Sequence, residues 1–274
     1  MNQKSNIEEK HDFLTINERQ IYCNIYIPLK RTEENRGIIL CKPIWGERIR
    51  THRIFTNLSR LLADHGFHVI TCDYYGDGNS LGDTLDLSFD GMVNDINNLF
   101  TYFKNNYSSI SYSLVGLRIG ATVAMAAAPF IKPVEKIILI EPILSLTDYL
   151  KEGLRANLTS QMTAYKKIIK NRDLLIEDIK NGIPVNMDGF MIGKKLWQSF
   201  EKVDPQQLSQ NINSKVILFS IVESRKKGNN IDDSQLKFSN KIVKFIHQEF
   251  IWTDWKYYQP NPPIFFKEIL SELR

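Results

Sequence analysis

The chain has 274 residues, of which 43% are hydrophobic and 24% are charged, and this globular composition excludes a mostly disordered, collagen-like or coiled-coil protein. A chain of this length can bury a sizeable core as one large α/β domain, so no disulfide or metal is needed for stability. The formal net charge is only +4 and the basic residues are scattered, which argues against a nucleic-acid partner.

Apolar runs and helical periodicity predict an alternation of strands and helices along the first half of the chain. In chain order we predict a hairpin of strands 13–18 and 20–27 with a tight turn at 17–19, a strand at 37–41, a helix at 51–65, a strand at 67–72, a helix at 89–103, a strand at 111–115, a helix at 119–128 and a strand at 136–141. Short apolar strands that alternate with helices indicate a parallel sheet with helices on both faces.

The alternation stops after residue 142. Residues 143–213 are polar, with helical stretches at 146–169 and 173–180 and no buried strand pattern, so we predict a helical cap insertion. We interpret its basic residues at 166–172 as a solvated helix face. Strands resume at 216–222 and 243–252, with helical stretches at 235–241 and 263–273. The predicted fold is an α/β core of residues 1–142 and 214–274 around a mostly parallel eight-stranded sheet, with a cap at 143–213.

The three cysteines, Cys23, Cys41 and Cys72, lie in apolar runs and lack zinc-binding spacing. We interpret them as small buried side chains in a reducing compartment, and we expect no cofactor and no metal. Residues 1–11 are polar and lack the apolar core of a signal peptide, and the longest apolar stretch, 121–131, is too short to cross a bilayer. We therefore expect a cytoplasmic protein without membrane contact, and the sequence leaves a homodimer open.

The residues that follow the predicted strands are the natural place to look for a site, because ligands bind beyond the carboxyl ends of strands in open α/β sheets. The most informative segment is Gly116-Leu117-Arg118-Ile119-Gly120, between a strand and an Ala-rich helix. Its two glycines allow a sharp strand-turn-helix with close backbone contact. This pattern is typical of a nucleophile elbow, in which the central residue points into the active site.

On these residues the chain resembles the α/β-hydrolase superfamily, in particular its serine aminopeptidase S33-like branch and the exosortase A system-associated hydrolase 2 type of protein. The elbow of that type is Gly-Leu-Arg-Leu-Gly-Ala, which Gly116 to Ala121 match, and its Pro-Phe-x-Glu-Glu segment is approximated by Pro43 to Glu47. A further motif after the fourth strand is matched at Asp73, Gly76, Gly78, Ser80, Gly82 and Asp83. The resemblance covers most of residues 12–142 and implies an α/β-hydrolase fold.

The chain departs from the pattern of an active hydrolase at the elbow centre, where Arg118 stands in place of Ser, Cys or Asp. A guanidinium stays protonated at physiological pH and cannot attack a carbonyl. The order of a working triad is nucleophile, acid, then histidine. Glu223 suits the acid position, but no histidine follows the last predicted strand, and His247 falls within or before it.

Candidate catalytic residues are therefore Arg118, Glu47 and Glu223. Arg118 is either an anion clamp or a structural ion pair, and its potential carboxylate partners are Glu47, Asp77, Glu141 and Glu223. Glu47 is either a general base or a partner of Arg118, Arg48 or Arg50, on the loop that builds the oxyanion hole in active relatives.

Candidate substrate-binding residues are Trp45, Gly46, Ile119, Asp77 and Trp255. The two tryptophans follow strand ends, and the backbone N–H of Ile119 takes the place of an oxyanion donor. Asp77 lies in a Gly-rich loop, where a turn role is the alternative.

Two classes of function follow from these residues. The first is a hydrolase-like protein without the Ser–His pair that acts on, or binds, the carbonyl of an acyl or peptidyl small molecule in a biosynthetic pathway, for example by proton transfer next to a carbonyl. The second is a pseudoenzyme that binds a small carboxylate or a partner protein. A simple esterase or thioesterase follows from the resemblance but conflicts with Arg118.

Overall fold

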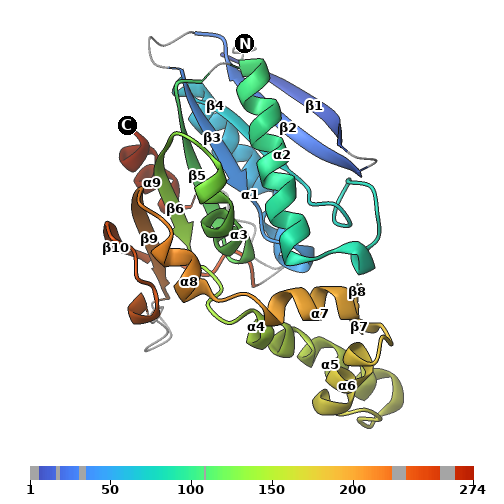
Figure 1. Cartoon of the computed structure of the whole chain (residues 1–274). Coiled ribbons are helices and arrows are strands. Elements are labelled where there is room, and N and C mark those ends of the chain that lie inside the picture. The colour runs from blue at the N-terminus through green and yellow to red at the C-terminus, as the bar shows by residue number, and fades with distance from the viewer. Residues whose placement is uncertain (1–5, 17–18, 31–34, 108, 224–232, 254–262) are drawn as a thin grey trace, which may run out of the picture.

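An eight-stranded sheet forms the centre of the molecule in the computed structural model, which describes residues 6–16, 19–30, 35–107, 109–223, 233–253 and 263–274. In spatial order the strands are β1 (Ile7–Ile16), β2 (Arg19–Pro28), β4 (His68–Cys72), β3 (Arg36–Cys41), β5 (Ser111–Leu117), β6 (Val134–Ile140), β9 (Lys215–Val222) and β10 (Lys241–His247). The pairings β1–β2 and β2–β4 are antiparallel and the other five are parallel. The predicted mostly parallel, eight-stranded α/β architecture is confirmed (Figure 1).

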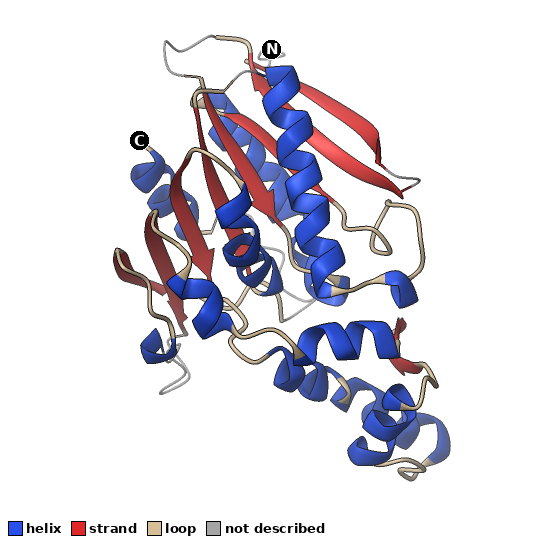
Figure 2. Cartoon of the chain, in the orientation of Figure 1, coloured by secondary structure: helices blue, strands red, loops and turns tan. Residues whose placement is uncertain are grey.

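Helices cover both faces of this sheet (Figure 2). On one face pack α1 (Trp45–Asp64) and α9 (Phe265–Leu273), and on the other pack α2 (Phe89–Tyr107), α3 (Ile119–Ala127) and α8 (Pro205–Gln210). The period of two along β3 shows why: Ile38 and Leu40 join the core on the α1 side, whereas Ile39 and Cys41 join the core on the α2 side. Strands buried on both faces read as continuous apolar runs, which is why the sequence revealed them.

The segment between β6 and β9 lies beyond the carboxyl ends of the parallel strands (Figure 1). It contains α4 (Leu146–Gly153), α5 (Arg155–Tyr165), α6 (Arg172–Lys180), β7 (Val185–Met187), β8 (Phe190–Ile192) and α7 (Lys194–Glu201), followed by α8. We predicted no strand here, and that was wrong, because β7 and β8 form a short antiparallel hairpin. Asp188 and Gly189 make its turn with φ of 53° and 91°, and an Asp-Gly pair is a strong hairpin signal.

Several other predicted elements have different bounds or a different form. The first strand is Ile7–Ile16 and not 13–18, and the helical stretch predicted at 146–169 is divided into α4 and α5. The helical stretch predicted at 235–241 is wrong, because residues 236–240 are not helical and β10 begins at Lys241.

The helix predicted to start at residue 51 begins at Trp45. The sequence does not reveal this start, because Ile44 offers no capping side chain and Gly46 is a poor helix former. The last strand ends at His247 and not at residue 252, because Ile251 and Trp252 are buried in a turn that follows the strand. The predicted turn of the first hairpin includes residues 17 and 18, which lie outside the described residues.

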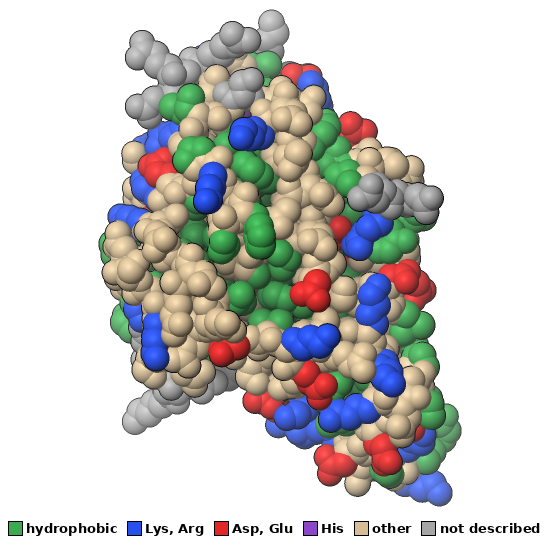
Figure 3. Space-filling model, viewed as in Figure 1, with side chains coloured by type: hydrophobic (Ala, Val, Ile, Leu, Met, Phe, Trp, Pro, Cys, Tyr) green, Lys and Arg blue, Asp and Glu red, His purple; other side chains and the backbone are tan. Residues whose placement is uncertain are grey.

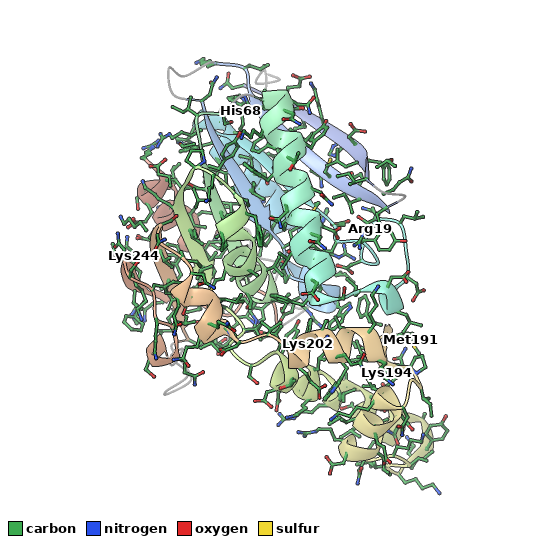
Figure 4. The ribbon with its side chains drawn as sticks, in the orientation of Figure 1. Arg19, His68, Met191, Lys194, Lys202 and Lys244 are labelled. Atoms are coloured by element: carbon green, nitrogen blue, oxygen red, sulfur yellow. The ribbon has the colours of Figure 1, made fainter. Side chains whose placement is uncertain are left out.

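Short 3₁₀ helices complete the described elements at η1 (Thr84–Asp86), η2 (Ala128–Phe130) and η3 (Asp233–Gln235). The three cysteines are buried and free, as expected. The antiparallel edge is tied to α2 by Arg19, labelled in Figure 4, whose Nη2 donates to Asp95 Oδ1 at 3.0 Å. Among the helices described, none is long and apolar enough to cross a membrane.

Candidate functional site

Arg118 occupies the turn between β5 and α3, where the chain reverses beyond the carboxyl end of the sheet. Its φ of 56° and ψ of −125° lie in a region that side chains other than glycine rarely adopt. Close packing of the two flanking glycines holds this conformation: a Cβ on Gly120 would lie 2.2 Å from the carbonyl oxygen of Cys41, and one on Gly116 would lie 2.5 Å from the Cα of Ala121. The turn therefore has the sharp, strained geometry of a nucleophile elbow.

Glu47 is the carboxylate that meets Arg118. It lies in the first turn of α1 and not on a loop, and its Oε1 accepts a hydrogen bond from Arg118 Nε at 3.1 Å. The two side chains are 13% and 21% exposed, so the ion pair is mostly shielded from water. Burial raises the pKa of Glu47, while Arg118 and the neighbouring Tyr149 hydroxyl oppose that rise.

Aromatic rings surround the guanidinium of Arg118. Its Cζ lies 5.1 Å from the ring centroid of Trp252 and 5.9 Å from that of Tyr149, within the range of cation–π attraction. Trp45 stacks parallel to Tyr149 with centroids 6.3 Å apart. These contacts leave little freedom to the guanidinium and keep water away from the ion pair.

A cavity of about 260 Å³ opens beside this pair. It is lined by Ile44, Trp45, Gly46, Glu47, Arg50, Arg118, Tyr149, Glu152, Gly153, Ala156, Met187, Asp188 and Phe190. The lining thus joins the first turn of α1 and the elbow to α4, the start of α5 and the β7–β8 hairpin. Within the described part of the chain, no cluster of metal-ligating side chains was found.

Several buried polar atoms of the lining residues lack hydrogen-bond partners among the residues described, and two of them bear on a ligand. One is the indole Nε1 of Trp45, a donor on a side chain that is only 3% exposed. The other is Oε2 of Glu47, an acceptor, although the Tyr149 hydroxyl interacts with the same carboxyl group and lowers its pKa. A buried polar atom without a partner costs about 1–3 kcal/mol, so both atoms would gain from a ligand with the complementary group.

Glu223 and the segment after β10 form a second part of the site region. Glu223 follows β9, and its Oε1 accepts a hydrogen bond from the backbone N–H of Phe250 at 3.1 Å. This contact helps to hold the turn that carries Trp252 onto Arg118. Glu223 does not line the cavity, so in the structure it supports the segment around the site and does not face a ligand there.

His247 differs from our expectation. It is the last residue of β10 and so lies at the carboxyl end of the sheet, where we expected no histidine. Its side chain is exposed and is not part of the cavity lining, and the aromatic side chain that meets Arg118 from this segment is Trp252. Among the residues that the structure describes, no serine or cysteine lines the cavity either.

Two of the predicted substrate-binding residues lie elsewhere than in the cavity wall. Asp77 is buried and accepts a hydrogen bond from Arg48 Nε at 2.8 Å, while burial raises the pKa of its carboxyl. Ile119 is buried as the first residue of α3, and Trp255 lies outside the described residues. Of the predicted set, Trp45, Gly46, Glu47 and Arg118 share the cavity.

Sequence reasoning missed Tyr149 as a site residue. It lies on one face of α4 with Leu146, Leu150 and Gly153, at helical spacings of three, four and seven. That spacing indicates that Tyr149 faces the rest of the protein.

Glu141, considered as a partner of Arg118, is instead buried with its Oε1 accepting from the backbone N–H of Ile221 at 2.6 Å.

Comparison with known proteins gives one family and many similar structures. The model of the family described as serine aminopeptidase, S33, matches residues 48–211, and no curated protein sequence matches the chain. Among solved structures, Est1E from Butyrivibrio proteoclasticus with ferulic acid bound has a TM-score of 0.69 at 12% identity, with 96% of each chain covered. An esterase from Pyrococcus furiosus has a TM-score of 0.62 at 15% identity, covering 97% of this chain and 89% of its own.

A proline iminopeptidase from Mycobacterium smegmatis has a TM-score of 0.62 at 13% identity, covering 96% of this chain and 97% of its own. At such low identities these likenesses concern the fold alone.

Proposed function

The chain belongs to the serine aminopeptidase S33 family, and from that premise we propose that it is a non-hydrolytic member which binds the carbonyl or carboxylate of a small acyl or peptidyl molecule. The observation that carries this proposal is Arg118 at the elbow, paired with Glu47 and facing a cavity that no serine, cysteine or histidine of the described part of the chain lines. A guanidinium offers a fork of donors to a carboxylate or carbonyl but no electron pair for attack.

Arg118, which lines the cavity, and two enclosed polar atoms beside it favour a ligand over an inert, sealed site. Trp45 Nε1 and Glu47 Oε2 are enclosed by protein, and an amide group that enters the cavity wall beside them would supply an acceptor to the first and a donor to the second. Arg118 retains N–H donors beyond the single Nε bond to Glu47, so a carboxylate can bind without breaking the ion pair. These features support N-acylated amino acids and short peptides as the ligand class.

We assign two further features to this proposed function. Residues 143–213 act as a cap, supported by the side chains that they contribute to the cavity wall, among them Tyr149, Met187 and Phe190. The Gly116–Ala121 and 73–83 motifs support the exosortase A system-associated hydrolase 2 type, which places the ligand in a biosynthetic pathway.

Two measurements test the proposal. The first is labelling with a fluorophosphonate probe, which we expect to be absent; labelling that a single serine substitution abolishes would show a hydrolase. The second is calorimetric titration with N-acetylglycine, N-acetylleucine and N-acetylphenylalanine, of which at least one is expected to bind.

The Arg118→Ala variant is expected to weaken that binding by roughly 30-fold or more, because two charge-assisted hydrogen bonds are lost. The matched control is Arg60→Ala, which removes an exposed arginine paired with Glu9 away from the cavity and leaves binding unchanged. Unchanged binding in Arg118→Ala, or no binding of any of the three compounds to the wild-type protein, contradicts the proposal.

Glu47 also favours a second candidate function, proton transfer next to the bound carbonyl. Its raised pKa and its unpartnered Oε2 suit a general base, and Arg118 would stabilise the negative charge that develops on the carbonyl oxygen. The test is exchange of the α-hydrogen of a bound ligand with D₂O, followed by NMR. Exchange that Glu47→Gln abolishes supports this chemistry, and absence of exchange leaves the protein as a binding protein.

A further inference from the structure

The end of α5 and the loop that follows it expose an unusual concentration of apolar side chains. Met162, Tyr165, Ile168 and Ile169 are 46% to 60% exposed, and we call these four residues the apolar tip. Of the sixteen large apolar side chains exposed among the described residues, six fall between residues 162 and 183. Single exposed apolar residues are ordinary, but a group of them marks an interaction surface.

Basic side chains are interleaved with the apolar tip. Lys166, Lys167 and Lys170 lie within the same stretch of nine residues and all are exposed. Lys170 pairs with Asp178, whereas Lys166 and Lys167 have no carboxylate partner in the described chain. Figure 3 shows green apolar and blue basic side chains together, with some acidic ones, at the end of the molecule where Figure 1 places α5 and α6.

The loop that presents the two isoleucines is fixed by exposed hydrogen bonds between its backbone and one side chain, that of Gln161. Gln161 Oε1 accepts from the backbone N–H of Ile169 at 2.7 Å and of Lys170 at 2.9 Å, and Gln161 Nε2 donates to the carbonyl oxygen of Lys170 at 2.9 Å. These three hydrogen bonds fix the backbone at residues 169 and 170, where the side chains of Ile169 and the preceding Ile168 are exposed.

We propose that the apolar tip is a docking surface for an anionic lipid bilayer. Apolar side chains that enter the interface, with lysines beside them that reach lipid phosphates and carboxylates, are the pattern of proteins that lie on a membrane without crossing it. The charge argues for an anionic lipid surface, because residues 162–172 carry four basic side chains and no acidic one. This assignment revises the expectation of no membrane contact and of a merely solvated basic face at 166–172.

Docking at this surface would place the cavity close to the bilayer. Ala156, in the first turn of α5, lines the cavity, and Met162 and Tyr165 of the apolar tip follow on the same helix, about 9 Å and about 14 Å farther along its axis at 1.5 Å per residue. A ligand with an acyl chain could then pass from the lipid surface to the cap without crossing bulk water. The docking proposal itself does not depend on what the cavity binds.

Co-sedimentation with vesicles tests the proposal directly. The full-length protein is expected to bind vesicles of phosphatidylcholine with 30% phosphatidylserine, to bind pure phosphatidylcholine at least tenfold more weakly, and to lose binding at high salt. The double variants Lys166→Gln/Lys167→Gln and Ile168→Ser/Ile169→Ser are each expected to weaken binding to the anionic vesicles roughly tenfold or more.

The control variant is Leu29→Ser/Lys30→Gln, which changes one exposed leucine and one exposed lysine at the opposite end of the sheet. It is expected to bind as the wild type does, and circular dichroism checks that every variant is folded. No vesicle binding, or binding that the two tip variants leave unchanged, overturns the proposal. A concentration-dependent dimer that Ile168→Ser/Ile169→Ser abolishes, without vesicle binding, would show that the surface joins two copies of the chain.

Discussion

The ion pair between Arg118 and Glu47 makes a quantitative prediction through a double-mutant cycle. The single changes are Arg118→Met, which keeps an apolar stem against Trp252, and Glu47→Gln, which keeps the shape of the side chain. At a separation of 3.1 Å and an effective dielectric constant of about 20, the attraction is about 5 kcal/mol. Residual exposure of 21% and 13% and the cost of desolvation reduce this, so we expect a coupling energy of about 1–3 kcal/mol.

The losses in the free energy of unfolding of the two single variants should add up to more than the loss of the double variant, because each single change leaves one charge without its partner in a shielded place.

The Arg118→Met effect should also depend on pH. The pKa of Glu47 is already raised by burial, and removal of Arg118 raises it further. A carboxyl with a raised folded-state pKa stabilises the folded protein below its unfolded pKa, and this contribution is lost as pH rises through the folded pKa. Arg118→Met is therefore most destabilising at neutral and higher pH and least so in acid.

The assay is guanidinium chloride unfolding, followed by tryptophan fluorescence, for the wild type, both single variants and the double variant. The matched control cycle uses Arg60 and Glu9, an ion pair that is 50% and 26% exposed on the surface, for which we expect a coupling energy below about 1 kcal/mol. A coupling energy between Arg118 and Glu47 no larger than that of the control pair would refute the view that this pair is a strong interaction at the site.

Two further predictions concern stability away from the pair. Burial raises the pKa of Asp95 to about 6, so its contribution to stability is present below about pH 4 and is lost as pH rises through about 6. Relative to the wild type, Asp95→Asn should gain about 2–3 kcal/mol in the free energy of unfolding between pH 4 and pH 7, measured by urea unfolding, and a constant difference would contradict this. Gly120→Ala should lose about 2–4 kcal/mol in thermal or denaturant unfolding, because its Cβ would lie 2.2 Å from the carbonyl oxygen of Cys41. Gly46→Ala is the control, with a loss below about 1 kcal/mol because its Cβ would meet only the flexible end of Arg50 at 3.1 Å, and equal losses in both variants would contradict the packing argument.

The architecture could be predicted because each buried strand is a short continuous apolar run. Val115 and Leu117 on β5 face the α1 side of the sheet while Leu114 faces the other side, and only apolar residues satisfy both environments. Elements that depend on local backbone conformation were harder to find. The start of α1 has neither a capping side chain nor a strong helix former, and the β7–β8 hairpin has strands of only three residues.

At the candidate site, the position of Arg118 could be predicted from the spacing of Gly116 and Gly120, but its surroundings could not. Tyr149 and Trp252 reach it from segments 31 and 134 residues away along the chain. The place of Trp252 depends on the early end of β10 at His247 and on the hydrogen bond from Phe250 to Glu223. Neither feature has a local sequence signal, so the aromatic wall around the guanidinium became visible only in three dimensions.

The geometry of the elbow does not depend on which side chain stands at its centre. Backbone packing of Gly120 against Cys41 and of Gly116 against Ala121 fixes the turn, and neither contact involves the side chain at position 118. The fold therefore points whatever residue stands there toward the carboxyl end of the sheet, at the cost of a strained φ of 56°. A nucleophile in this place attacks a carbonyl, whereas a guanidinium can only bind one. The strained turn therefore presents the side chain of Arg118 to the site where a ligand would bind, as the proposed function requires.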